Sequence, residues 1–336
     1  MTTLFERVSA LVEEARLSAS RQVNATLVLR NWHLGRLVSE SVLGDERGEY
    51  GRSVLASLSQ RLKATYGPGF DETNLRRMVQ FAREFSDDQI RVSPIRELGW
   101  TQILALLPLK STDARAFYAQ QAVERHLSVK ELRGIIERKA YERREIANSQ
   151  VVPGSAVPLD SFRDPYLLDF LQLGGAYQER DLEAAIIREL EPFLLEVGDG
   201  WTFVARQKRM VIDGEDFSLD LLFYSRPLRR LVAVELKIGK FKPGYKGQLE
   251  LYLRWLDRYE RREGEETPIG LILCTEASRE QIELLQMHKD GIAVAEYWTT
   301  LPPKALLEER LHTIWRDAQE RVARRAIQAG EETSGE

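Results

Sequence analysis

The sequence has 336 residues, of which 43% are hydrophobic and 30% are charged, so it is long enough to form two domains. No apolar stretch is long enough to cross a bilayer, and the first residues lack the basic-then-apolar order of a secretory signal, so we expect a cytoplasmic protein without a membrane span. A single cysteine and four scattered histidines exclude a disulfide and a zinc site built on those residues, which leaves carboxylates as ligands for any metal.

Charge is distributed unevenly between the two halves of the chain. Residues 1–150 contain 23 Lys and Arg against 19 Asp and Glu, whereas residues 151–336 contain 25 against 33. The basic half is rich in arginine, a residue that suits contact with phosphate groups, although the excess is modest. The two halves are therefore expected to differ in role.

The first half has apolar residues at helical spacing and little strand-like alternation, so residues 1–147 are predicted to form an all-helical domain. A capping-box pattern from Ser128 to Glu131 marks the start of its last helix. The expected helical segments are 4–12, 25–42, 53–66, 71–85, 100–107, 113–124 and 128–146.

One of these helices has features of a DNA-binding element. It follows the helix-breaking residues 67–70, and Asp71 is expected to be its N-cap. The polar residues Asn74, Arg77 and Arg83 face away from its apolar stripe. This arrangement resembles a helix-turn-helix and predicts contacts with DNA, while an ordinary solvated helix face is an equally good interpretation.

Residues 148–163 contain two prolines, a glycine and small polar residues, and we predict a linker there. The second domain is then expected to occupy residues 164–328. The polar residues 329–336 are expected to form a disordered tail.

The second domain changes to strand-like periodicity. After a helix spanning 181–196, three apolar runs follow closely, and Asp213-Gly214 between the first two is a strong hairpin signal. The whole pattern predicts a mixed sheet with helices on its faces. The expected strands are 202–212, 217–224, 231–238, 269–275 and 292–297, with helices at 245–263 and 278–288.

Charged residues stand inside two of these apolar strands. Asp220 lies among bulky apolar neighbours, and Glu235 and Lys237 are two residues apart, which places them on one face of a strand. Burial of such groups is costly unless they pair or bind a cation. A structural interpretation pairs Glu235 with Lys237 and Asp220 with an arginine. If Asp220 lies beside Glu235, a hard divalent cation between the two carboxylates is the better explanation.

The spacing from Asp220 to Glu235-Leu236-Lys237, preceded by a helix that carries an acidic residue, resembles the PD-(D/E)XK nuclease superfamily, although Leu219 stands where the superfamily has proline. Further segments of both halves are similar to the YhcG-type branch of these proteins and to its N-terminal helical, winged-helix-like domain. They include 29–35, 58–62, 74–82, 164–171, 181–183, 193–198, 206–207, 216–224 and 240–252.

This resemblance implies a restriction-endonuclease-like fold and a Mg²⁺-dependent endonuclease, with Mn²⁺ as a plausible substitute. The implied metal ligands are Asp220, Glu235 and the backbone carbonyl of Leu236. Glu183 would complete the acidic site, and Glu179 and Glu189 compete with it for this role. The resemblance also implies that Lys237 orients water and stabilises negative charge, and that Gln248 is an auxiliary polar residue.

The implied substrate is DNA, and RNA is not excluded. Arg206, Gln207, Lys240 and Lys242 are candidates for contact with the phosphate backbone, because an acidic site needs flanking cations to hold a polyanion. An ordinary solvated side chain is an equally good interpretation of each of them. Many enzymes of this superfamily dimerise, so a homodimer is expected. The alternative function is a catalytically silent protein that uses the nuclease-like core as a platform for DNA binding or assembly.

Overall fold

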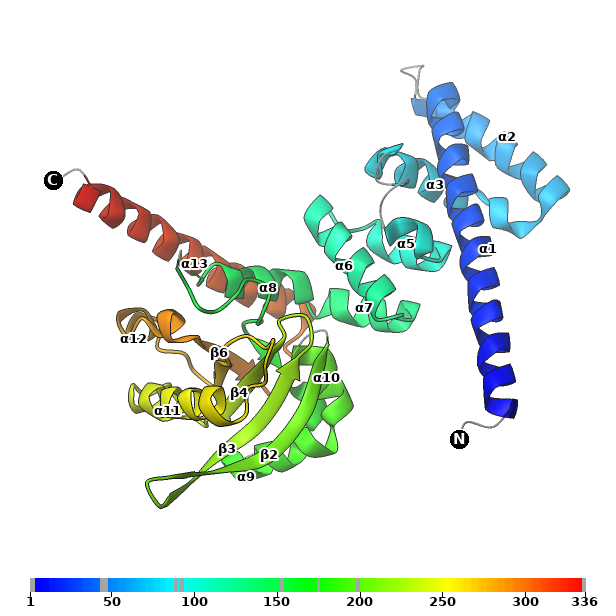
Figure 1. Cartoon of the computed structure of the whole chain (residues 1–336). Helices are drawn as coiled ribbons and strands as arrows, with labels where there is room; N and C mark the ends of the chain where they lie inside the picture. Colours follow the sequence, from blue (N-terminus) through cyan, green and yellow to red (C-terminus); the bar gives the residue numbers. More distant parts are fainter. Residues whose placement is uncertain are drawn as a thin grey trace. The chain divides into compact units, whose positions relative to one another are not determined.

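A computed structural model of the chain describes residues 4–42, 48–87, 90, 94–151, 154–173, 176–197 and 200–333. The chain forms two compact units, Met1–Ile136 and Glu137–Glu336, which we describe separately (Figure 1). Among the helices of the described ranges, none is both long enough and apolar enough to span a membrane.

The described elements of the first unit are all helical, as the sequence predicted. The expected segments 4–12 and 25–42 are parts of one continuous helix, because the sequence between them contains neither glycine nor proline to interrupt it. The elements of this unit are α1 (Leu4–Val42), α2 (Gly48–Tyr66), η1 (Pro68–Phe70), α3 (Glu72–Glu84), η2 (Pro94–Glu97), α5 (Trp100–Leu106), α6 (Thr112–Glu124) and α7 (Val129–Glu137).

Helix α3 packs closely against α1. A Cβ atom added to Gly35 of α1 would lie 1.9 Å from the carbonyl oxygen of Met78 in α3, so only glycine permits this approach. The indole nitrogen of Trp32 donates a hydrogen bond to the Phe85 carbonyl at 2.9 Å, which fixes the end of α3 to the same helix. The predicted cap is also present, since the Asp71 carboxylate accepts from the Asn74 backbone amide at 2.9 Å.

The second unit is built on a six-stranded mixed sheet with strand order β1-β6-β5-β4-β3-β2. The antiparallel meander of β2, β3 and β4 is present as predicted, and β4, β5, β6 and β1 run parallel. At the tip of the first hairpin Asp213 and Gly214 have φ values of 50° and 84°, as expected for this tight turn. The strands are β1 (Tyr166–Leu167), β2 (Trp201–Ile212), β3 (Glu215–Ser225), β4 (Arg230–Leu236), β5 (Ile269–Cys274) and β6 (Ile292–Trp298).

Helices cover both faces of this sheet, and each face has its own apolar core. One face carries α9 (Glu179–Arg188) and α10 (Leu190–Val197), and the other carries α11 (Gly244–Tyr259), with α12 (Arg279–Leu284) beside it (Figure 1). The single helix expected over 181–196 is interrupted at Glu189. Pro192 explains this break, because a proline ring clashes with the backbone four residues earlier and cannot donate the helical hydrogen bond.

The segment at 148–163, expected to be a linker, contributes to this second unit. Its Val157 and Phe162 side chains are buried in the core on the α9 and α10 side of the sheet. Before it, α8 (Ala140–Asn148) packs through Ile146 against α13 (Lys304–Thr333). Helix α13 continues into the expected tail as far as Thr333, and residues 334–336 lie outside the described residues.

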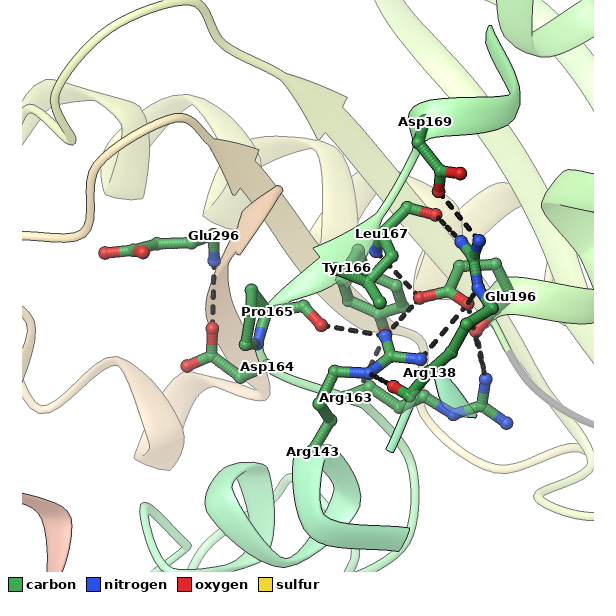
Figure 2. Close-up of polar contacts among 10 residues, drawn as sticks. All are labelled: Arg138, Arg143, Arg163, Asp164, Pro165, Tyr166, Leu167, Asp169, Glu196 and Glu296. Carbon is green, nitrogen blue, oxygen red and sulfur yellow. Dashed lines mark hydrogen bonds and ion pairs between the residues drawn. The ribbon is translucent and has the colours of Figure 1, made fainter. Parts of the chain in front are cut away.

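A buried network of charges ties α8 to the sheet (Figure 2). The Glu196 carboxylate of α10 accepts hydrogen bonds from the guanidinium of Arg143 in α8 and, at 2.8 Å, from the backbone amide of Leu167 in β1. Arg163 donates to the Glu196 carbonyl at 2.6 Å, and Arg138 pairs with Asp169 at 2.8 Å. Arg143 is fully buried, so this network is a structural part of the core.

Candidate active site

The two strand carboxylates lie where β3 and β4 separate. Their antiparallel register ends with Leu221 opposite Val234, and Asp220 and Glu235 are the next residues on the two strands. Beyond this point the Asp220 side chain takes the place of a strand partner, because its Oδ2 accepts from the Leu236 amide at 2.9 Å. The end of the ladder thus brings an acidic side chain to the edge of β4.

Glu235 of β4 and Lys237, the residue directly after this strand, have their side chains on the same side, as their spacing predicted. The Lys237 Nζ atom lies 2.9 Å from Glu235 Oε2 and 4.0 Å from Glu179 Oε2, and it lies over the ring of Tyr245 at 5.4 Å from the centroid. Glu179, in the first turn of α9, also accepts from the Ile238 amide at 3.2 Å. The ammonium group therefore lies between two carboxylates and an aromatic face.

The environment changes the protonation of these groups. Burial, and then the nearby charge of Asp220, raises the pKa of Glu235 to about 7, against the attraction of Lys237. Burial also raises the pKa of Asp220. For Lys237, burial favours the neutral form, but Glu235 and the other carboxylates outweigh this effect and raise the pKa of the ammonium.

Glu235 has an unsatisfied oxygen. Its side chain is only 3% exposed, and Oε1 has no hydrogen-bond partner among the described residues. A buried carboxylate oxygen without a donor is costly, and a hard cation is the ligand that such an oxygen beside Asp220 fits best. Within the described ranges no three acidic, histidine or cysteine side chains are grouped to hold a metal, so these two carboxylates would need backbone or water oxygens to complete a coordination shell.

Glu183 of α9 lies near Asp220 but is held by other side chains. Its carboxylate accepts from Nε of Arg206 through one oxygen and from the amide of Gln207 through the other. Gln207 also donates to Asp220 Oδ1 at 3.2 Å, and its own Oε1 accepts from the Ser218 hydroxyl at 2.7 Å. Arg206 and Gln207, predicted to contact phosphate, are thus both engaged with Glu183.

The other residues predicted in the second unit differ in their surroundings. Gln248 of α11 donates to the Tyr252 hydroxyl at 2.8 Å, and Tyr252 interacts electrostatically with Glu235 and Asp220. Lys240 pairs with Glu276 at 3.4 Å, and Lys242 is exposed. Glu189, one of the competitors of Glu183, pairs with its neighbour Arg188 at 3.2 Å.

The residues predicted in the first unit have different surroundings. Asn74 accepts from the Trp100 indole at 2.9 Å and donates to the Gly69 carbonyl at 2.6 Å, so its side chain holds α3 to neighbouring segments. Arg77 and Arg83 are exposed on the same helix. Only the two arginines of this set have side chains that are largely open to solvent.

Ser218, Tyr245 and Tyr252 also contact residues of the site. No motif in the sequence assigns Ser218 to it, and for the two tyrosines the sequence favours packing in the core over stacking on bases. Ser218 and Tyr252 carried a positional signal: Ser218 is two residues before Asp220 on one strand, and Tyr252 follows Gln248 by one helical turn. No such signal marks Tyr245, because its contact with Lys237 depends on how α11 packs against the sheet.

Comparisons with known proteins match most of the chain. Residues 159–312 match the family described as YhcG PDDEXK nuclease domain, and residues 7–143 match the DUF1016 N-terminal domain. The Escherichia coli (strain K12) protein named "Putative nuclease YhcG" is 33% identical over an alignment 340 residues long, which covers 90% of this chain and 91% of that protein.

Solved structures are more distant. A repair endonuclease from Pyrococcus abyssi is 22% identical, with 39% of this chain and 50% of that chain covered and a TM-score of 0.26. An EndoMS–dsDNA2 complex is 18% identical, with 39% and 49% covered and a TM-score of 0.29. This chain spans about half the length of both structures. The two domain matches and the long alignment with the Escherichia coli protein show that the chain belongs to the YhcG family, with a DUF1016 N-terminal domain followed by a PDDEXK nuclease domain.

Proposed function

We propose that this protein is a Mg²⁺-dependent endonuclease that hydrolyses phosphodiester bonds, with DNA as its favoured substrate. The observation that carries the proposal is the buried Oε1 of Glu235, beside Asp220 and Lys237, which has no hydrogen-bond partner in the described part of the chain. Two adjacent buried carboxylates destabilise a folded protein unless a bound cation compensates their charge.

The ligands proposed for Mg²⁺ are the carboxylates of Asp220 and Glu235 and the backbone carbonyl of Leu236. All are oxygens, which Mg²⁺ prefers, and Mn²⁺ accepts the same donor set. When bound, the ion supplies positive charge to a phosphate oxygen and makes water more acidic.

Lys237 contributes a fixed positive charge. Because the carboxylates around it raise the pKa of its ammonium, Lys237 stays protonated at neutral pH and acts as a hydrogen-bond donor rather than as a base. Of its donor directions, one is used by Glu235 at 2.9 Å, which leaves others for a phosphate oxygen or a water molecule. Gln248 is proposed as an auxiliary donor, oriented by its hydrogen bond to Tyr252.

Exposed cations would hold the polyanionic substrate. In the nuclease domain the candidates are Lys240 and Lys242, which follow Lys237 closely in sequence, and in the N-terminal domain they are Arg77 and Arg83. We also propose a homodimer, which would give two centres for two strands. Light scattering with and without DNA tests this point, and a monomer under both conditions would refute it.

The first experiment is a cleavage assay with Mg²⁺, Mn²⁺ or EDTA on a panel of plasmid, linear, single-stranded and branched DNA and RNA. The chain is compared with Asp220→Asn, Lys237→Ala and the matched control Asp216→Asn. Asp216 lies on the same strand as Asp220 but is exposed and pairs with Arg209 at 2.7 Å, so its variant makes the same chemical change outside the site.

Metal-dependent cutting that is retained by Asp216→Asn and lost in the two site variants would support the proposal, and the preferred substrate would identify the class of nucleic acid. Salt-sensitive DNA binding without any cutting, equal in all variants, would replace it with the alternative of a silent DNA-binding platform. Cutting that survives in Asp220→Asn would place the chemistry elsewhere.

A further inference from the structure

Gln207 has an unusual backbone for a residue within a strand. It lies in β2 between Arg206 and Lys208, which pair with Leu221 and Leu219 of β3, so it lies opposite Asp220. Its φ is 46°, in the left-handed region that side-chain-bearing residues rarely adopt. Such a conformation persists only where surrounding contacts compensate for it.

The contacts that compensate converge on the side-chain amide of Gln207. The amide nitrogen donates to Asp220 Oδ1 at 3.2 Å and to Glu183 Oε2, while the Ser218 hydroxyl donates to the amide oxygen at 2.7 Å. Ionised carboxylates only accept hydrogen bonds, so the amide nitrogen must face them, and the amide oxygen then accepts from the Ser218 hydroxyl on the other side.

The amide occupies a place that would otherwise favour a cation. Glu183 and Asp220 are two carboxylates that share one neighbour, and their charges repel. A neutral donor with two N–H groups bridges them, and Arg206 neutralises Glu183. A carboxylate oxygen has two lone-pair directions, so Asp220 can still offer a lone pair on the side of Glu235, whose Oε1 has no partner within the described ranges.

We propose that Gln207 is a positioning residue that separates Glu183 from the metal centre and thereby restricts this centre to one divalent ion, held by Asp220 and Glu235. This inference rests on the proposed function, since it presupposes a metal at those two carboxylates. On this proposal Glu183 is not a metal ligand, and its carboxylate holds Gln207 and Arg206 in place by accepting their hydrogen bonds.

The test counts the Mn²⁺ ions bound by the full-length chain, using calorimetric titration together with the electron paramagnetic resonance signal of free Mn²⁺. Gln207→Glu keeps the shape of the side chain but replaces the donor with a third carboxylate. We expect one Mn²⁺ per chain for the unchanged protein and two for Gln207→Glu. The control Gln281→Glu adds the same charge on the exposed part of α12 and should bind one Mn²⁺ ion.

Circular dichroism verifies that each variant folds. If Gln207→Glu does not fold, Gln207→Ala is used in its place, and we expect it to bind a second Mn²⁺ ion more weakly than the first.

Two failures are distinguishable. The role of Gln207 would be overturned, with the metal centre left in place, if the unchanged chain and Gln207→Glu both bound two Mn²⁺ ions with equal affinity. The same conclusion would follow if the unchanged chain, Gln207→Glu and Gln207→Ala each bound one ion. No Mn²⁺ binding, or binding that Asp220→Asn does not weaken, would overturn the proposed metal centre and this inference with it.

Discussion

Replacement of Glu235 by glutamine is expected to stabilise the metal-free protein at alkaline pH, although it removes a site residue. Glu235 has a pKa of about 7 against an ordinary value of 4.5, because burial and Asp220 disfavour its charged form more than Lys237 favours it. A carboxyl whose pKa rises on folding binds protons more tightly in the folded state. The stability it contributes is therefore present below pH 4.5 and is lost as the pH rises to 7.

The size of the effect follows from this pKa difference. At pH 8 the charged carboxylate costs about 3 kcal/mol relative to a neutral group, and at pH 5 the cost falls to less than about 1 kcal/mol. Lys237 keeps Asp220 and Glu179 as counter-charges, so loss of Glu235 does not leave its ammonium unpaired. For a domain of this size, about 3 kcal/mol corresponds to an increase in melting temperature of about 6–12 °C.

Differential scanning calorimetry with EDTA at pH 5 and pH 8 measures this difference between Glu235→Gln and the unchanged chain. Glu215→Gln, an exposed position of β3, is the matched control and should melt like the unchanged chain. Added Mn²⁺ should stabilise the unchanged chain more than Glu235→Gln. A lower melting temperature for Glu235→Gln at pH 8 would refute the reasoning, because it would mean that the ion pair with Lys237 outweighs the cost of burial.

Three other outcomes are expected. Burial disfavours the charged form of Glu196, but Arg143 and Arg163 outweigh this effect and lower its pKa. The charged Glu196 therefore stabilises the folded chain, and this stabilisation is lost as the pH falls below the pKa that Glu196 has in the unfolded chain. Glu196→Gln should therefore cost about 3–5 kcal/mol in urea unfolding at pH 7, and a loss below 1 kcal/mol would contradict this. Gln207→Gly should melt higher than Gln207→Ala by about 2–4 °C, because glycine adopts the positive φ without strain, and equal melting temperatures would argue against such strain. Asn74→Ala should cost about 1 kcal/mol through the lost bond to Trp100, measured by thermal unfolding, and weaker DNA binding at unchanged stability would instead indicate a direct contact.

Features that depend on neighbouring residues were predictable from the sequence. The hairpin at Asp213-Gly214, the cap at Asp71 and the capping box from Ser128 to Glu131 are all present, the last with a bond of 2.7 Å from the Ser128 amide to Glu131. The strand periodicity was enough to define β2 to β6 within a few residues. In each case one short-range interaction decides the local conformation.

Features that depend on distant residues were not predictable in this way. The strand β1 has only two residues, and its pairing with β6 joins segments about 130 residues apart. The left-handed Gln207 lies within the strand β2, where its side chain contacts Glu183, Asp220 and Ser218. The local sequence shows which residues are present, but it does not show the long-range contacts that determine their conformation.

Two buried glutamates illustrate the difference between structural and functional charge. Both Glu196 and Glu235 lie in apolar segments, and only Glu235 has a lysine two residues later. Arg143 and a backbone amide donate to the Glu196 carboxylate, and the surrounding arginines lower its pKa against the effect of burial. At Glu235, burial and the adjacent charge of Asp220 raise the pKa against the attraction of Lys237, and Oε1 has no donor among the described residues. A fold gains nothing from that second arrangement in the absence of a ligand. The cost of burying Glu235, compared with the paired carboxylate of Glu196, is the physical reason for which we propose the metal centre at β4.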